Sequence, residues 1–442
     1  MIQVGQILFI LSVLVILHEF GHYITAKMFK VKVEKFYLFM DAGFSLVKKK
    51  IGETEWGIGW LPLGGYVKLA GMIDESMDTE QLKQEPQPWE FRSKPAWQRL
   101  IIMLGGIIVN ILLAWIIYTA LYTTYGQKYI STEVVQQNGL TFGESGLNAG
   151  FKNGDKIVSV DGKLQERFNR MTLDVLLGKE IVVDRNGKQE TIVLTDEAKK
   201  DILGLEGKSF MSPRLTSIQI DSILPGLPAE KAGILVGDKI VGANNSPITY
   251  FDELKTVLDN NKNKEISIDV IRNNQPVTLN AQVSENATLG FLPKFDSLEE
   301  SQVVNKLSFV DAVKAAIDES YQLIVYNVKQ FKLILSPKTE AYKQVKSPIG
   351  IARMLPDTWD WEFIWSFTAL FSIGLAFMNI LPIPGLDGGH ALFTIAEMIT
   401  GKKLSEKTMG YVQTAGMIIL LTLMALTFGK DIYELIIDKF VK

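Results

Sequence analysis

Four apolar stretches, each long enough to cross a lipid bilayer, constrain the fold of this 442-residue chain more than any other feature. They occupy residues 3–24, 98–122, 361–383 and 411–428, and a transmembrane helix needs about 20 mostly apolar residues. The first stretch lacks a basic start and a small-residue cleavage site, so we interpret it as a retained span and not as a signal peptide. The sequence therefore predicts a polytopic α-helical membrane protein with four transmembrane helices.

Composition indicates that only part of the chain is membrane-embedded. Hydrophobic residues make up 47% and the mean hydropathy is +0.14, which is high for a soluble protein and low for a chain made only of membrane helices. A net charge of −3 gives no indication of nucleic acid as a partner. The absence of cysteine excludes disulfides and thiolate metal ligands.

Basic residues predict how the chain is threaded through the bilayer. They cluster between the first two stretches and at the start of the second, at Lys27, Lys30, Lys32, Lys35, Arg92, Lys94 and Arg99. By the positive-inside rule this loop is cytoplasmic, which places both termini and residues of about 125–345 on the extracytoplasmic side. The first and third spans then end at the same membrane depth, near the cytoplasmic side.

The region between the second and third spans contains an internal repeat. "AGFKNGDKIVSVDG" (149–162) recurs as "AGILVGDKIVGANN" (232–245), and "VDRNG" (183–187) is echoed by "VIRNN" (270–274). Each copy is predicted to form a strand, a helical stretch and a β-hairpin with a turn at signals such as Asn186-Gly187. The copies resemble PDZ domains, at 125–215 and 216–295, which bind peptide C-termini by strand addition. The alternative is that one or both serve as rigid spacers.

The segment 296–345 is predicted to carry amphipathic helices that lie on the membrane surface. Apolar residues recur at helical spacing over 305–335 but are interrupted by charged ones, and Ser308 with Asp311 forms a plausible capping box. Such a helix is too charged to span a bilayer comfortably, which favours a surface position. A soluble helix that packs on the second repeat is the alternative.

The motif HEFGH, residues 18–22, carries the chemistry at the end of the first span. His18 and His22 share one helix face and can bind one metal ion, for which zinc is well suited. Glu19 is then placed to take a proton from a water molecule that the metal has acidified. The alternative, histidines that are merely hydrogen-bonded, leaves Glu19 unexplained, because inserting a carboxylate costs about 2.5–3.5 kcal/mol or more.

A catalytic zinc site needs a third protein ligand. Asp387, in the "GLDGG" that follows the third span, is the best candidate because the predicted topology sets it at the depth of HEFGH. His390 is the competitor, because it lies only three residues further on, but it can equally cap the helix that follows.

A protease that acts inside the membrane must hold its substrate extended, since helical peptide bonds are hydrogen-bonded and shielded. Asn379, Pro382 and Pro384 break the end of the third span and offer an amide side chain to an incoming strand. The glycine-rich stretch 43–72 alternates as in a small sheet, whose edge can pair with substrate backbone. Both features also have purely structural alternatives, a tolerated proline kink and a folded loop.

Taken together and in order, five motifs resemble those of the bacterial site-two intramembrane metalloproteases. They are HEFGH, "PLGGYVKL", "FRSKPAWQRLIIMLGGIIVN", the tandem PDZ-like units and "NILPIPGLDGGH". The resemblance implies one catalytic Zn²⁺ bound by His18, His22 and Asp387, with Glu19 as the catalytic base. It also implies that Asn379, Pro382 and Pro384 contact the substrate.

Further residues acquire roles only through this resemblance. Gly64, Gly65 and Tyr66 correspond to a membrane-reentrant β loop, here about residues 36–72, that clamps the substrate. Asn110 corresponds to the family's polar position in the second span, and Ile107 replaces a proline that is frequent there. The implied membrane domains are 1–124, with the first two helices, and 346–442, with the last two.

The resemblance also implies a biological setting, which is regulated intramembrane proteolysis in the bacterial inner membrane. Expected substrates are single-span membrane proteins such as anti-sigma factors, together with remnant signal peptides, and the PDZ-like pair is expected to exclude untrimmed substrates. Two alternatives compete: a noncatalytic PDZ-bearing scaffold, which has no need of Glu19, and an ion transporter, for which the expected inverted repeat is missing.

Overall fold

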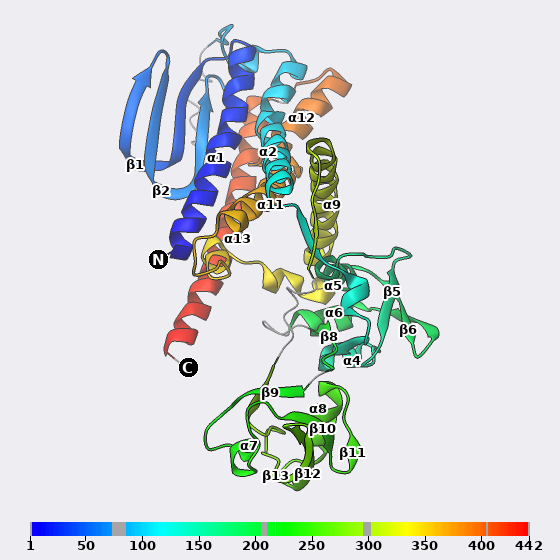
Figure 1. Ribbon diagram of the computed structural model, residues 1–442. Helices are drawn as coiled ribbons and strands as arrows, with labels where there is room; N and C mark the ends of the chain where they lie inside the picture. Colours follow the sequence, from blue (N-terminus) through cyan, green and yellow to red (C-terminus); the bar gives the residue numbers. More distant parts are fainter. Residues whose placement is uncertain are drawn as a thin grey trace. The chain divides into compact units, whose positions relative to one another are not determined.

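A computed structural model describes residues 2–72, 85–204, 210–216, 218–294, 302–403 and 405–440 (Figure 1). The chain divides into two compact units. The helical unit comprises Met1–Gly126, Lys306–Lys332 and Gln344–Lys442, and the insert unit comprises Gln127–Asn305 and Leu333–Lys343. Residues 296–301, the start of the predicted amphipathic segment, lie outside the described residues.

Four long helices dominate the helical unit: α1 (Ile2–Met28), α2 (Ala96–Thr124), α11 (Trp361–Ile380) and α13 (Glu406–Phe440). Each is long and apolar enough to cross a membrane, which confirms the prediction of four membrane helices. The predicted end of the third span at residue 383 is wrong by three residues. Helix α11 ends at Ile380 because Leu381 precedes a proline and takes up extended backbone angles.

Glycines bring α1 and α2 into close contact. A Cβ atom on Gly21 would collide with the carbonyl oxygen of Gly105, and one on Gly105 would lie 2.6 Å from the Gly21 carbonyl oxygen. Small residues at this position let the two backbones approach, as is common between membrane helices. The helix that carries HEFGH is thereby held directly against α2.

Strands β1 (Val33–Ile51) and β2 (Thr54–Leu69) form a small antiparallel sheet in the helical unit. Both strands fold back on themselves, so that Leu38 of β1 pairs with Gly65 on one side and with Ile58 on the other. The second half of β2 is therefore an outer edge, and within the described residues no further strand pairs with it. The sheet predicted within residues 36–72 is present and begins slightly earlier.

Helix α9 (Phe309–Leu335) packs within the helical unit. Ala316 is fully buried in a cluster with Ala114 of α2 and Ala369 of α11. Ser308 caps the helix, since its Oγ accepts a hydrogen bond from the Asp311 N–H at 3.2 Å. The predicted helix is thus present, and its buried face contacts membrane helices.

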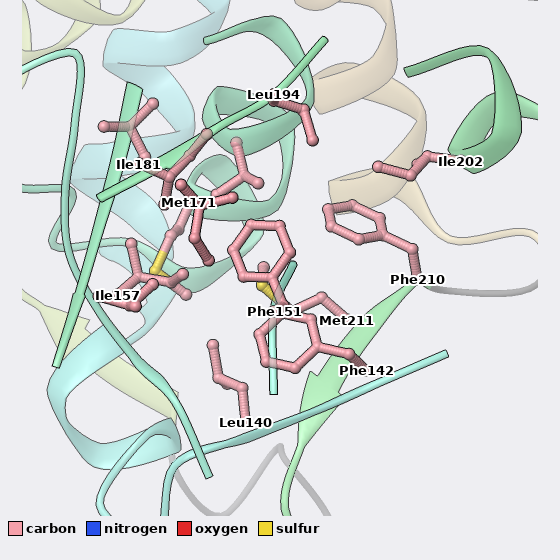
Figure 2. Close-up of a cluster of buried hydrophobic side chains, with 14 of the residues drawn as sticks. Leu140, Phe142, Phe151, Ile157, Met171, Ile181, Leu194, Ile202, Phe210 and Met211 are labelled. Atoms are coloured by element: carbon pink, nitrogen blue, oxygen red, sulfur yellow. The ribbon is translucent and has the colours of Figure 1, made fainter. Parts of the chain in front are cut away.

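The insert unit contains two lobes in which elements follow the same order. The first has β5 (Lys156–Val160), α5 (Phe168–Leu177), β6 (Glu180–Arg185) and β7 (Lys188–Val193). The second has β10 (Lys239–Ala243), α8 (Phe251–Asn260), β12 (Glu265–Arg272) and β13 (Gln275–Gln282). Each lobe has its own hydrophobic core, and Figure 2 shows the first, where the rings of Phe142 and Phe151 stack.

Each lobe has its own internal ion pair, and the two pairs lie at matching places in the repeat. Arg185 contacts Asp155 at 2.7 Å in the first lobe, and Arg272 contacts Asp238 at 2.7 Å in the second. Each pair connects the glycine-aspartate turn of the repeated motif to the hairpin strand that follows the helix. The predicted hairpin turn at Asn186-Gly187 is present, with φ angles of 53° and 81°.

The remaining strands and α-helices are shorter. In the insert unit they are β3 (Gln127–Ile130), α3 (Thr132–Val135), β4 (Leu140–Phe142), α4 (Glu144–Asn148), α6 (Asp196–Leu203), β8 (Met211–Pro213), β9 (Ile218–Ile223), α7 (Pro228–Lys231), β11 (Ser246–Pro247), β14 (Phe291–Pro293) and β15 (Gln302–Asn305). In the helical unit they are α10 (Pro348–Ala352) and α12 (Asp387–Thr400). Helix α12 begins with Asp387 and brings this residue to the histidines of α1.

Candidate metal centre

The last turns of α1 present His18, Glu19 and His22 to a cavity of about 240 Å³. Both histidines are 7% exposed, and β2, α2, α11, α12 and α13 supply the other walls. The α-helical spacing of four residues puts the two imidazole rings on one face, with ring centroids 4.9 Å apart. Polar groups of a membrane helix are thereby collected around one internal space.

Asp387 joins the two histidines from the first residue of α12. Its Oδ2 lies 3.2 Å from His18 Nε2 and 3.2 Å from His22 Nε2, and the two Nε2 atoms are 3.4 Å apart. The turn that delivers the carboxylate passes through Gly385, whose φ of +94° disfavours residues with a side chain. Two groups separated by 365 residues of sequence (22 to 387) thus meet at one point.

These three residues fit a zinc ion. Tetrahedral ligands at about 2.0–2.1 Å from zinc are about 3.3 Å from one another, and the three donor atoms are 3.2–3.4 Å apart. Among the described residues, Asp387 Oδ2 has no hydrogen-bond partner although it is buried. A buried carboxylate oxygen without a hydrogen bond, together with two imidazole nitrogens, makes a suitable set of donor atoms for a divalent cation.

A backbone contact orients His22. Its Nδ1 lies 2.8 Å from the carbonyl oxygen of Ile102 in α2. Because a carbonyl only accepts, the ring proton sits on Nδ1 and Nε2 keeps its lone pair for a metal. The close approach of α1 and α2 is therefore also what aims this histidine.

Glu19 and Asn379 line the same cavity without belonging to the donor set. Glu19 is partly buried, on the helix turn between the two histidines. The Asn379 side chain reaches the site from the last turn of α11, with Nδ2 3.0 Å from His18 Nε2. The structure therefore places a carboxylate and an amide beside the three candidate ligands.

The other predicted substrate residues fall into two groups. Gly64, Gly65 and Tyr66 line the cavity from the outer edge of β2. Pro382 and Pro384 are not among the residues that line it. A Cβ atom on Gly416 of α13 would collide with the Pro384 carbonyl, so Pro384 lies in the turn that α13 packs against.

His390 lines the cavity but does not belong to the group of three donor atoms found among the described residues. It follows Asp387 by one turn of α12. Asn110 is fully buried on α2, with Nδ2 3.1 Å from His18 Nδ1. Of the two candidates for the third ligand, the structure thus places Asp387 and not His390 with His18 and His22. It also brings Asn110 to the far side of the His18 ring.

Sequence reasoning missed Gln413 of α13. Its side chain is buried and lines the cavity, and its Oε1 accepts a hydrogen bond from the Gly385 N–H at 2.7 Å. This bond fastens the turn that leads to Asp387. The available signal was the one amide side chain in the span 411–428, whose other polar side chains are hydroxyls.

Known proteins are similar in sequence to this chain over nearly its whole length. The sequence profile of Peptidase family M50 matches residues 6–423. A putative zinc metalloprotease of Neisseria meningitidis is 28% identical, over 97% of this chain and 98% of the relative. The regulator of sigma E protease of Haemophilus influenzae is 27% identical, over 98% and 99%, and the regulator of sigma-E protease RseP of Escherichia coli is 26% identical, over 96% and 97%.

Proposed function

The chain belongs to peptidase family M50 and is a metalloprotease. From this premise we propose that it is a site-two-type zinc protease that cleaves the transmembrane segments of single-span membrane proteins. One observation carries the proposal: His18, His22 and Asp387 converge at zinc-ligand spacing beside Glu19. They do so in a cavity walled by helices long and apolar enough to cross a membrane.

The proposed mechanism assigns one zinc ion to His18, His22 and Asp387. When bound, zinc would supply Lewis acidity, which lowers the pKa of water toward neutrality. Glu19 takes a proton from the water whose oxygen bonds to the peptide carbonyl carbon, and it gives that proton to the amide nitrogen that leaves when the peptide bond breaks. The Asn379 amide is available to hold the reacting peptide by hydrogen bonding.

We propose that the outer edge of β2 holds the substrate extended. Gly64 and Gly65 expose backbone without side chains in the wall of the cavity, and an edge strand can accept one further strand by β-augmentation. Tyr66 is fixed beside them, since its hydroxyl donates to Asp41 Oδ1 at 2.9 Å and its ring stacks on Tyr37. Pro382 and Pro384 contribute by ending α11 and forming the turn that leads to Asp387.

We further propose the setting implied by the relatives and by the basic residues of the first loop. The chain resides in the bacterial inner membrane, with the site near the cytoplasmic side and both termini and the insert outside. The two lobes of the insert act as PDZ domains, at 125–215 and 216–295, that bind peptide C-termini and exclude substrates with bulky external domains. Relatives named regulators of sigma E protease favour anti-sigma-like substrates, and remnant signal peptides are a second class.

The substitution Glu19→Gln tests this function. In proteoliposomes with a model single-span substrate, the variant should bind zinc as the wild type does and lose cleavage by about 10²-fold or more, the contribution expected of a general base. Glu133→Gln, an exposed carboxylate of the insert unit, is the matched control and should cleave normally. Cleavage by Glu19→Gln at the wild-type rate would disprove the assigned role.

A further inference from the structure

His18 has an amide group against each of its ring nitrogens. Asn379 Nδ2 lies 3.0 Å from Nε2, and Asn110 Nδ2 lies 3.1 Å from Nδ1. An amide nitrogen only donates, and a neutral imidazole can accept a hydrogen bond at only one of its two nitrogens. One of the two amides must therefore turn its oxygen toward the ring.

The metal-binding arrangement decides which amide must turn. Nε2 faces Asp387 Oδ2 and His22 Nε2, so Nε2 is the atom of His18 that must be unprotonated to bind zinc. The ring proton is then on Nδ1, and the group that faces Nδ1 has to be an acceptor. Asn110 can supply one, because rotation of its amide by about 180° exchanges Oδ1 and Nδ2.

The surroundings of Asn110 agree with this assignment. The residue is fully buried, and among the described residues Oδ1 has no hydrogen-bond partner. No second hydrogen bond therefore holds Oδ1 away from the His18 ring. The Asn110 backbone is fixed independently, since its carbonyl accepts a hydrogen bond from Ser372 Oγ of α11 at 2.7 Å.

We propose that Asn110 is a positioning residue for the metal site, which sets the proton of His18 on Nδ1 by accepting a hydrogen bond from it. The role matches that of the Ile102 carbonyl toward His22, so that α2 orients both histidine ligands. Outer partners of this kind typically change metal affinity by about 10–100-fold. The inference rests on the proposed zinc site, but it concerns metal affinity and not proteolysis.

Three variants of the full-length protein in detergent separate this role from simple filling of space. Asn110→Leu keeps the size of the side chain but removes the acceptor, and Asn110→Asp keeps an acceptor and removes the donor. Gln6→Ala is the matched control, because Gln6 is also a fully buried amide of a membrane helix and bonds to the Thr358 carbonyl at the other end of α1. Zinc affinity is measured by competition with a chromophoric chelator.

The expected result is zinc binding about 10–100-fold weaker in Asn110→Leu, with Asn110→Asp and Gln6→Ala close to the wild type. Wild-type affinity in Asn110→Leu would overturn the proposal. If Asn110→Leu does not fold, Asn110→Asp decides alone, because a tenfold or greater loss of affinity in that variant contradicts the acceptor role. A wild-type protein that binds no zinc would instead contradict the proposed function itself.

Discussion

Gly106 of α2 sits where the metal site tolerates no side chain. A Cβ atom built on Gly106 would lie 2.5 Å from His22 Nε2 and 2.6 Å from His18 Cε1. Ordinary contact begins at 3.4 Å, so Gly106→Ala must move the His22 nitrogen by about 0.9 Å, the difference between 3.4 and 2.5 Å. Metal–ligand distances vary by only about 0.2 Å in well-formed sites.

The displacement is therefore several times what a zinc site accepts, and both histidines are affected at once. We expect Gly106→Ala to lose bound zinc and to reduce kcat/KM by about 10²-fold or more, the effect of a 1 Å misplacement at a reacting centre. Zinc is measured as moles per mole of purified protein by mass spectrometry, and cleavage is measured in proteoliposomes.

Gly374→Ala in α11 is the matched control. Among the described residues, a Cβ atom there meets no atom within 4 Å beyond its own stretch of helix, so the variant should keep its zinc and activity. It should gain about 0.5–1 kcal/mol in stability, as glycine-to-alanine changes inside helices do. Stoichiometric zinc and a wild-type rate in Gly106→Ala would refute the steric reasoning.

Two further predictions concern Gln413 and the second lobe of the insert. Gln413→Leu removes the acceptor of the Gly385 N–H, and leaving this N–H unsatisfied costs about 1–3 kcal/mol. We expect weaker zinc binding in the variant, because the turn before Asp387 is held less firmly. An unchanged zinc affinity would contradict this role of Gln413. In the second lobe, the Arg272 guanidinium holds the pKa of Asp238 below its usual value near 3.8. A carboxyl whose pKa is lower in the folded than in the unfolded state stabilises the fold at any pH above its unfolded-state pKa. This stabilisation is lost as the pH falls through the folded-state pKa. Calorimetry of the full chain should therefore show Arg272→Gln destabilised at pH 7, with the difference from wild type shrinking below about pH 4; a constant difference would contradict the assignment.

Several features of the fold could be predicted because they depend on local patterns. Four apolar stretches produced four helices, and the Asn186-Gly187 signal produced a hairpin. The first three helices end within a few residues of the predicted bounds, whereas α13 continues to Phe440, well past the predicted end at 428. The predicted end at 383 failed since a run of apolar residues continues past the last helical turn, whereas Pro382 determines where the backbone leaves the helix.

Residues of the site were predictable to different degrees. The role of HEFGH as a metal-binding motif could be predicted from the sequence alone, because the spacing of its histidines and the cost of Glu19 in a membrane helix are both local properties. Asp387 was preferred to His390 because the predicted topology set it at the depth of HEFGH among flexible glycines, and because His390 could equally cap the following helix; both in fact line one cavity. Gln413 could not be assigned, because its role depends on a contact with the backbone of Gly385 from another helix.

By itself, then, the sequence determined the elements and the chemistry available at the end of the first span, since helix periodicity and hydrophobicity act over short distances. Only the tertiary structure decided that His18, His22 and Asp387 meet at 3.2–3.4 Å. It also decided that Gly106 and Asn110 of α2 lie against them. Such contacts depend on how closely α1, α2 and α11 pack, which no local pattern encodes. The glycines of the α1–α2 contact provide the physical reason, because they allow the two backbones to approach until α2 reaches the metal-binding rings.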